Sequence, residues 1–178
     1  DPPGETGAAV RRPDGTVFAT GSMPEGESKA HTAIWTPPTQ GTKGKWKAGP
    51  DFPNGDEAFD VPVSILPNGN VLVEGSSGSL YEFDGSGKPK ICGDSQAPAE
   101  PWFLEAAGEN IVGISHYGAL FRYNTQSGAF LRGKLDNLAP GGNAIMCLEA
   151  VTPDCVIGGN YSQQNLFTIN PRTGARFE

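Results

Sequence analysis

One pattern occurs four times along the chain, and it constrains the fold more than any other feature. Each copy has an apolar run, a polar turn, a second apolar run ending in small residues, a loop and a third run ending in Asn, Asp or Thr. Matching positions in the third runs are Trp35, Phe83, Tyr123 and Ile169, which gives steps of 48, 40 and 46 residues. Periods of about 40–50 residues with several short strands per unit are typical of propeller blades.

The local sequence favours strands over helices. Asp14-Gly15 and Asn68-Gly69 lie between apolar runs, and these pairs suit two-residue hairpin turns because Gly and Asn tolerate positive φ. No segment shows apolar residues at a 3.6-residue period over the length that a helix needs. The 25 Gly and 16 Pro residues punctuate short Val, Ile, Leu and Phe runs, as in a turn-rich all-β protein.

The repeats predict an all-β propeller fold with about four blades of four antiparallel strands, at residues 7–47, 58–90, 102–132 and 144–178. The whole chain, 1–178, is then a single propeller domain or a fragment of one. Within it, the stretch 46–76 is the outer strand of one blade, a loop, and the first hairpin of the next.

The fourth copy ends shortly after its third apolar run. We therefore expect a part of a larger propeller in preference to a complete four-bladed ring. The strand after Gly174 is expected to find its sheet partners only with help from further blades or a second chain, because strands usually run about five to six residues. Self-assembly through open sheet edges is a further possibility.

The first two copies resemble the kelch-type repeats of galactose-oxidase-like propellers. The resemblance covers residues 7–88 and is carried by Trp46, by Gly-Pro-Asp-Phe at 49–52 and by the hairpin PNGNVLVEGS at 67–76. The later copies are similar to generic propeller blades, and Ser115 stands where the kelch pattern has Gly.

The resemblance would imply a copper centre, but the residues of this chain do not support one. The family's site needs a Tyr-His pair, a further His, a second Tyr and a Cys crosslinked to Tyr. This chain has His116-Tyr117 in the reverse order and no matching Cys. We therefore assign no residue of this chain as a copper ligand, and we expect no metal and no cofactor.

The candidate binding residues lie in the longer loops, where propellers and other rigid scaffolds usually bind their ligands. The predicted ligand-binding set combines acidic, imidazole and aromatic side chains, which suit a sugar, a cation or a cationic peptide. Its members are His31, Asp60, His116, Tyr117 and Tyr161.

Charge and motifs exclude several functions. The net charge is −7 and the 13 Lys and Arg residues are scattered, so nucleic acid is not an expected partner. No apolar run approaches the roughly 18 residues that span a bilayer. Motifs of serine hydrolases, zinc proteases and P-loop enzymes are missing from the sequence, and no catalytic residue is assigned.

We therefore expect a non-catalytic, secreted binding module whose loops hold a carbohydrate or protein partner. The alternative is a fragment of a secreted oxidase-like or hydrolase-like enzyme whose catalytic residues lie mainly in other blades. The sequence does not decide between enzyme and binding module.

The three cysteines are Cys92, Cys147 and Cys155, an odd number that prevents complete internal pairing. Cys147 and Cys155 flank a turn, so they could face each other across a hairpin and form a disulfide. Two separate buried thiols are the alternative.

Overall fold

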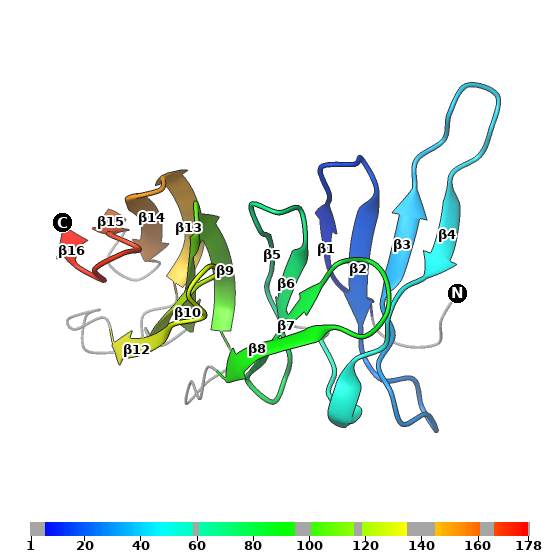
Figure 1. The fold of residues 1–178 in the computed structure, drawn as a ribbon, viewed down its shortest axis with the longest axis horizontal. Coiled ribbons are helices and arrows are strands. Elements are labelled where there is room, and N and C mark those ends of the chain that lie inside the picture. The colour runs from blue at the N-terminus through cyan, green and yellow to red at the C-terminus, as the bar shows by residue number, and fades with distance from the viewer. Residues whose placement is uncertain are drawn as a thin grey trace. The chain divides into compact units, whose positions relative to one another are not determined.

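The computed structural model describes residues 6–58, 61–94, 101–115, 119–134, 145–160 and 166–177. The strands form four antiparallel sheets of four strands each (Figure 1). The chain divides into two compact units, residues 1–94 and 95–178, and each contains two of the sheets. Across the described ranges, no helix is long and apolar enough to cross a membrane.

The first unit holds two sheets whose strands follow one another in sequence order. The first sheet contains β1 (Thr6–Arg11), β2 (Val17–Gly21), β3 (Ala33–Thr36) and β4 (Lys45–Ala48). A single 3-10 turn, η1 (Pro53–Gly55), precedes the second sheet. The second sheet contains β5 (Val63–Ile65), β6 (Val71–Glu74), β7 (Ser79–Phe83) and β8 (Lys90–Asp94).

The second unit repeats this arrangement. Its first sheet contains β9 (Pro101–Ala107), β10 (Asn110–Ser115), β11 (Ala119–Asn124) and β12 (Phe130–Lys134). Its second sheet contains β13 (Ile145–Thr152), β14 (Cys155–Asn160), β15 (Leu166–Ile169) and β16 (Arg176–Phe177).

Strand register confirms the alignment of the four copies. The four matched residues occupy equivalent positions in their sheets. Each lies opposite an apolar residue at the start of the second strand of its sheet. The pairs are Trp35 with Val17, Phe83 with Val71, Tyr123 with Ile111 and Ile169 with Val156. The predicted turns also form, with Gly15 and Gly69 at φ of 85° and 84°. The stretch 46–76 thus runs from β4 of one sheet into the β5–β6 hairpin of the next.

The expectation for the strand after Gly174 was wrong. β16 pairs with β15 inside the chain, with Phe177 opposite Thr168 and Arg176 opposite Ile169. The turn before β16 explains why so short a strand can pair. Asn170 accepts hydrogen bonds on its side chain from the N–H groups of Arg172 and Thr173, and Gly174 takes a positive φ of 78°. This reversal places the next residues directly beside β15.

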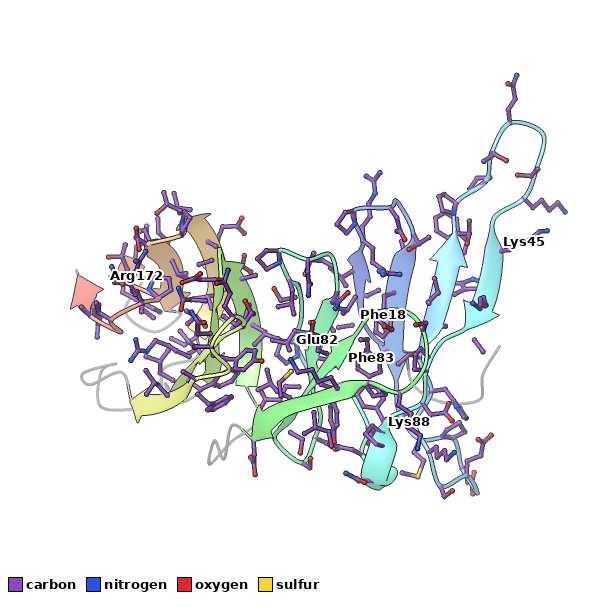
Figure 2. All side chains as sticks on the ribbon, in the orientation of Figure 1. Phe18, Lys45, Glu82, Phe83, Lys88 and Arg172 are labelled. Atoms are coloured by element: carbon purple, nitrogen blue, oxygen red, sulfur yellow. The ribbon has the colours of Figure 1, made fainter. Side chains whose placement is uncertain are left out.

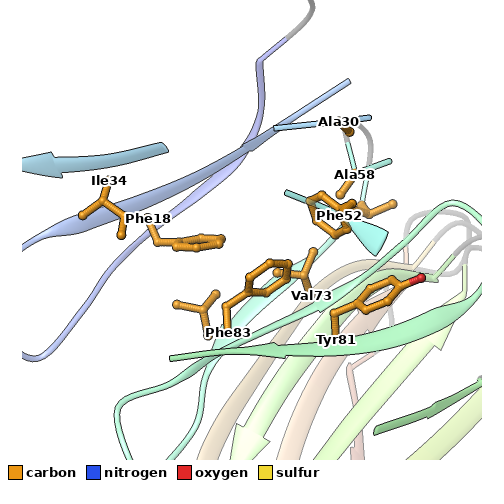
Figure 3. Close-up of a cluster of buried hydrophobic side chains, with 10 residues drawn as sticks. Phe18, Ala30, Ile34, Phe52, Ala58, Val73, Tyr81 and Phe83 are labelled. Atoms are coloured by element: carbon orange, nitrogen blue, oxygen red, sulfur yellow. The ribbon is translucent and has the colours of Figure 1, made fainter. Parts of the chain in front are cut away.

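Each unit has its own hydrophobic core. In the first unit, Phe18 of β2 and Phe83 of β7 have ring centroids 5.2 Å apart, and Phe52 from the loop after β4 lies 5.1 Å from Phe83 (Figure 3). The Phe52 ring also meets Tyr81 edge-on at 5.5 Å. In the second unit the core includes Ile114, Ile145, Val156 and Phe167.

An aromatic side chain on the third strand covers a glycine on the second in both sheets of the second unit. Phe121 lies opposite Gly113, and Phe167 lies opposite Gly158. A Cβ atom added at either glycine would collide with the facing ring. The equivalent residue in the second sheet is Tyr81, which lies opposite Val73 instead.

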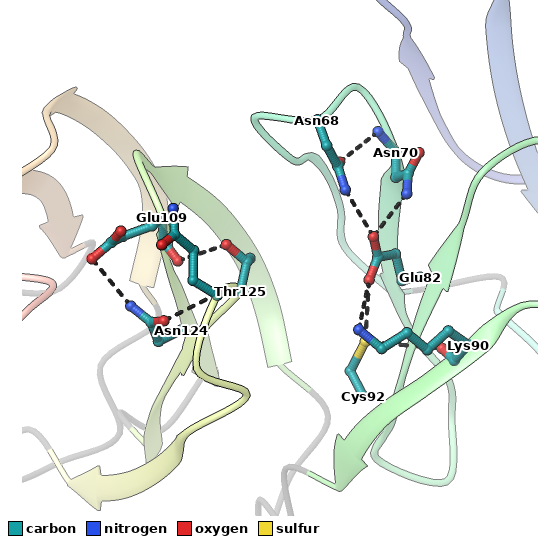
Figure 4. Close-up of polar contacts among 9 residues, drawn as sticks. Asn68, Asn70, Glu82, Lys90, Cys92, Glu109, Asn124 and Thr125 are labelled. Atoms are coloured by element: carbon teal, nitrogen blue, oxygen red, sulfur yellow. Dashed lines mark hydrogen bonds and ion pairs between the residues drawn. The ribbon is translucent and has the colours of Figure 1, made fainter.

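Polar contacts fix the ends of the hairpins (Figure 4). In the second sheet, Glu82 accepts hydrogen bonds from the side-chain amides of Asn68 and Asn70, at 3.0 and 2.8 Å. The Lys90 ammonium lies 3.3 Å from the same carboxylate. Burial opposes the charged form of Glu82, but these donors outweigh it and lower the pKa of the carboxyl group.

Within each unit, an arginine of one sheet bonds to the turn that follows the third strand of the other sheet. Arg12 donates from Nη2 to the carbonyl oxygen of Asp84 at 2.9 Å in the first unit. Arg122 donates from Nη1 to the carbonyl oxygen of Arg172 at 2.5 Å in the second. Both acceptors are backbone atoms.

Candidate functional site

The loops before β3 and after β4 meet at His31. Its Nδ1 atom lies 2.8 Å from Oδ1 of Asp51, and its Nε2 atom lies 2.7 Å from Oε2 of Glu27. Lys29 adds a 3.5 Å ion pair to the other oxygen of Asp51. We call Glu27, Lys29, His31 and Asp51 the His31 cluster. The two loops flank the β3–β4 strand pair, which explains why residues 20 apart in sequence come together.

The carboxylates determine the charge of the imidazole. The hydrogen bond to Asp51, and next the one to Glu27, raise the pKa of His31, and partial burial opposes them. The same contact with His31 lowers the pKa of Asp51. The cluster therefore favours a protonated His31 between two carboxylates, with Lys29 as a second cation. Such a group can donate and accept hydrogen bonds but has no ring nitrogen free to take a proton from a substrate.

A second polar centre is formed at Asp56, in the same loop after β4 that carries Asp51. This carboxyl group is buried and accepts five hydrogen bonds. The donors are Tyr81 OH at 2.7 Å, Ser77 Oγ at 2.5 Å, Ser76 Oγ at 3.0 Å, and the N–H groups of Glu57 and Ser77 at 2.9 and 3.1 Å. Asp56 thus joins the loop after β4 to the β6–β7 turn.

The Asp56 carboxyl group stays ionised in this setting. Burial alone would raise its pKa, but the hydrogen bonds from Ser77 and Tyr81 outweigh burial and lower it. Burial, and then the bond to Asp56, raise the pKa of Tyr81. Asp56 holds the loops in place and is not open to a ligand, since it is 6% exposed.

In the second unit, the carboxyl group of Glu105 on β9 has a perturbed pKa. Burial raises the pKa of Glu105, the hydrogen bond from the backbone of Ala150 opposes this, and the charge of Glu149 raises it further. In the part of the chain that the structure describes, no group of three or more His, Cys, Asp or Glu residues is arranged to hold a metal ion.

The structure describes one member of the predicted ligand-binding set, His31. Asp60, His116, Tyr117 and Tyr161 lie outside the described residues. The contacts of His31 with Asp51 and Glu27 are visible only in the structure. The Asp56 centre was missed as a unit, because its Ser and Tyr donors lie 20 to 25 residues further along the chain.

Cys147 and Cys155 are free thiols. The disulfide that the sequence left open is not formed. Cys147 lies opposite Gly159 and Cys155 lies opposite Thr152, so the two cysteines are on different rungs of the β13–β14 hairpin. Nor do both thiols match the buried alternative, since Cys147 is exposed and Cys155 is half-buried.

Comparison with solved structures establishes the type of fold. The chain is similar to the crystal structure of BamB from Moraxella catarrhalis, with a TM-score of 0.59 and 12% identity, over 98% of this chain and 46% of that one. It is also similar to the crystal structure of HIRA(644-1017), with a TM-score of 0.52 and 10% identity, over 98% of this chain and 55% of that one. The fold is that of a β-propeller.

The chain spans about half the length of each of these two structures. No protein-family model matches the sequence, and no curated protein matches it. At 10–12% identity, the likeness concerns the fold alone.

Proposed function

We propose that this chain is part of a secreted binding module that holds a carbohydrate or protein partner on the loops around His31. The observation that carries the proposal is the His31 cluster: an ordered set of two carboxylates, an imidazole and an ammonium on loops between rigid strands. Such alternating donors and acceptors suit hydroxyl groups of a sugar or polar groups of a peptide.

The geometry favours binding over catalysis at this place. Both His31 ring nitrogens are engaged by carboxylates, and none of its hydrogen bonds goes to a Ser, Thr or Cys side chain in the described residues. A nucleophile and its base are normally within hydrogen-bond reach of one another. The proposal includes the kelch-type character of residues 7–88. It is supported by Phe52 of the Gly-Pro-Asp-Phe segment, which packs against both Phe83 and Tyr81. That kelch-type character is also the reason for proposing a location outside the cytoplasm.

A glycan array and a pull-down from extracellular fluid would test the proposal with three proteins: the unchanged chain, Asp51→Asn and Lys88→Ala. Lys88 is exposed on the β7–β8 turn and serves as the matched control. We expect a ligand that is retained by the unchanged chain and by Lys88→Ala, and lost or weakened with Asp51→Asn. Equal retention by all three proteins would place the binding site elsewhere.

A further inference from the structure

The outer strand of the first sheet has an unusual surface. β4 is the last strand in its sheet, and all four of its residues are exposed. Trp46 at its centre is 63% exposed. The β3–β4 hairpin extends beyond the neighbouring β1–β2 turn (Figure 1). An exposed edge strand offers backbone groups to which another strand can pair.

The hydrogen-bonding pattern between β3 and β4 shows which backbone groups of β4 point toward the open edge. Gly49 donates its N–H to the carbonyl oxygen of Thr32, so these two residues form a hydrogen-bonded pair. Hydrogen-bonded and non-hydrogen-bonded pairs alternate along an antiparallel ladder. Trp46 and Trp35, three rungs away, therefore form a non-hydrogen-bonded pair. The N–H and C=O of Trp46 consequently point away from β3, toward the open edge.

The hairpin is cationic in an acidic protein. Residues 33–48 contain Lys43, Lys45 and Lys47 and no Asp or Glu, so this segment carries +3 while the chain as a whole carries −7. Within the described ranges, the lysines that form ion pairs are Lys29 and Lys90, not these three. Lys45 lies at the outer edge of the sheet (Figure 2).

The two faces of β4 differ in chemistry. Side chains alternate along a strand, so Lys45 and Lys47 share one face and Trp46 lies on the other, on the same face as Trp35. Lysines on an edge strand commonly prevent pairing with a second copy, because like charges would lie opposite each other. The same lysines favour an acidic partner, and an exposed Trp is not needed for repulsion alone.

We propose that the open edge of β4 binds an extended acidic peptide as a fifth antiparallel strand. In this arrangement the peptide residue opposite Trp46 is apolar, and its backbone exchanges both hydrogen bonds with Trp46. The peptide residues on either side are acidic and lie opposite Lys45 and Lys47. The partner is thus recognised by an acidic–apolar–acidic alternation together with its backbone.

The probe for this proposal is a fluorescein-labelled nonapeptide of alternating Glu and Val, titrated against the full chain by fluorescence anisotropy. Two N-methylated versions provide the decisive comparison. Methylation of the Val nitrogens removes the N–H groups that would face β4, and we expect binding to weaken about tenfold or more. Methylation of the Glu nitrogens removes N–H groups that would face solvent, and we expect a change of less than about threefold.

Protein variants test the side-chain part of the proposal. The double variant Lys45→Glu/Lys47→Glu should weaken binding about tenfold or more, Trp46→Ala should also weaken it, and Lys88→Glu should not. Equal affinity for both methylated peptides, or a heparin affinity that matches that of the unmethylated peptide, would show simple polyanion adsorption and overturn the proposal. No binding of the unmethylated peptide would also overturn the proposal. The lysines would then serve only to prevent strand pairing with a second copy of the chain.

The proposed strand edge uses none of the residues of the His31 cluster. His31→Ala should therefore leave peptide binding unchanged, and loss of a ligand from the loops would say nothing against the strand edge. Failure of either experiment leaves the other proposal standing.

Discussion

Asp56 connects two parts of the first unit that are distant in sequence. Its carboxylate accepts hydrogen bonds from Ser76, Ser77 and Tyr81, and its loop leads from β4 to β5. A buried carboxylate is costly unless it is fully bonded, and here five donors surround it. Removing the acceptor would take away the hydrogen bonds that the Tyr81 hydroxyl and the two turn serines donate to Asp56.

Asp56→Ala should therefore lower the free energy of unfolding by about 3 kcal/mol, and Tyr81→Phe by about 1–2 kcal/mol, because the second change leaves Asp56 with four donors. Urea denaturation would measure both.

The pKa of Asp56 is lowered in the folded state, so its contribution to stability is present above the unfolded-state pKa, roughly 3.9, and is lost as the pH falls through the folded-state pKa. The difference between the unchanged chain and Asp56→Ala should narrow below about pH 4. A constant difference between pH 2 and 7 would contradict this account.

His31 gives a second prediction at this scale. Its pKa is raised by Asp51 first and by Glu27 second, so an NMR titration should place it above the usual value of about 6.5. Asp51→Asn should bring the pKa down toward that value, and Glu27→Gln should have a smaller effect. The pKa of His31 is higher in the folded than in the unfolded state. The stabilisation from its protonation is therefore complete below about pH 6.5 and is lost as the pH rises through the folded-state pKa. An unchanged His31 pKa in Asp51→Asn would disprove the contact.

At the scale of strands, the second unit depends on close approach between aromatic rings and glycines. The Phe167 ring lies over Gly158, so the β14–β15 pair has no room there for a side chain. Arg176 of β16 also lies 5.5 Å from the centre of the same ring. Phe167 thus contacts both neighbouring strands of its sheet.

Gly158→Ala should destabilise the protein by about 1–3 kcal/mol, since the new methyl group displaces the Phe167 ring. The double variant Gly158→Ala/Phe167→Leu provides the control. If the ring is the obstacle, Gly158→Ala should cost clearly less in the Phe167→Leu background, as a thermal-denaturation cycle would show. Strictly additive costs would mean that the backbone, and not the ring, excludes the methyl group.

Sequence was sufficient where structure is local. Asn68-Gly69 specifies its own hairpin turn. The equivalent register positions of Phe83 and Tyr123 in their two sheets follow from the repeated sequence pattern. It was insufficient where chain segments meet. The contact of His31 with Asp51 depends on how two loops close, and the register of Cys147 depends on irregularities in the β13–β14 ladder. The β16 pairing was missed because turn chemistry at Asn170 outweighs strand length.

At the scale of the whole molecule, each unit contains a cluster of buried hydrophobic side chains among its described residues. Phe83 belongs to the cluster of the first unit, whereas Val156 and Phe167 belong to that of the second. Neither cluster contains a described residue of the other unit. Phe83 and Phe167 thus belong to different clusters of buried side chains.

Phe83→Ala should therefore affect the two units unequally. Loss of a buried phenylalanine costs about 3–5 kcal/mol, and we expect faster hydrogen exchange in β2, β6 and β7 with little change in β10 and β14. Hydrogen exchange measured by mass spectrometry would resolve the strands. Phe167→Ala is the reciprocal variant and should give the opposite pattern. Equal loss of protection throughout the chain in both variants would show that the units unfold together.

The arginine contacts between sheets have a consequence for how such a chain can change over generations. Arg12 and Arg122 both bond to a backbone carbonyl, and the accepting turns have unrelated sequences, DGSG in one unit and NPRTG in the other. A contact with the backbone does not depend on the side chain of the accepting residue. Mutations can therefore accumulate in the turn without loss of the contact, provided that the turn keeps its shape. Copies of a repeat joined in this way can diverge in sequence while adjacent sheets stay connected.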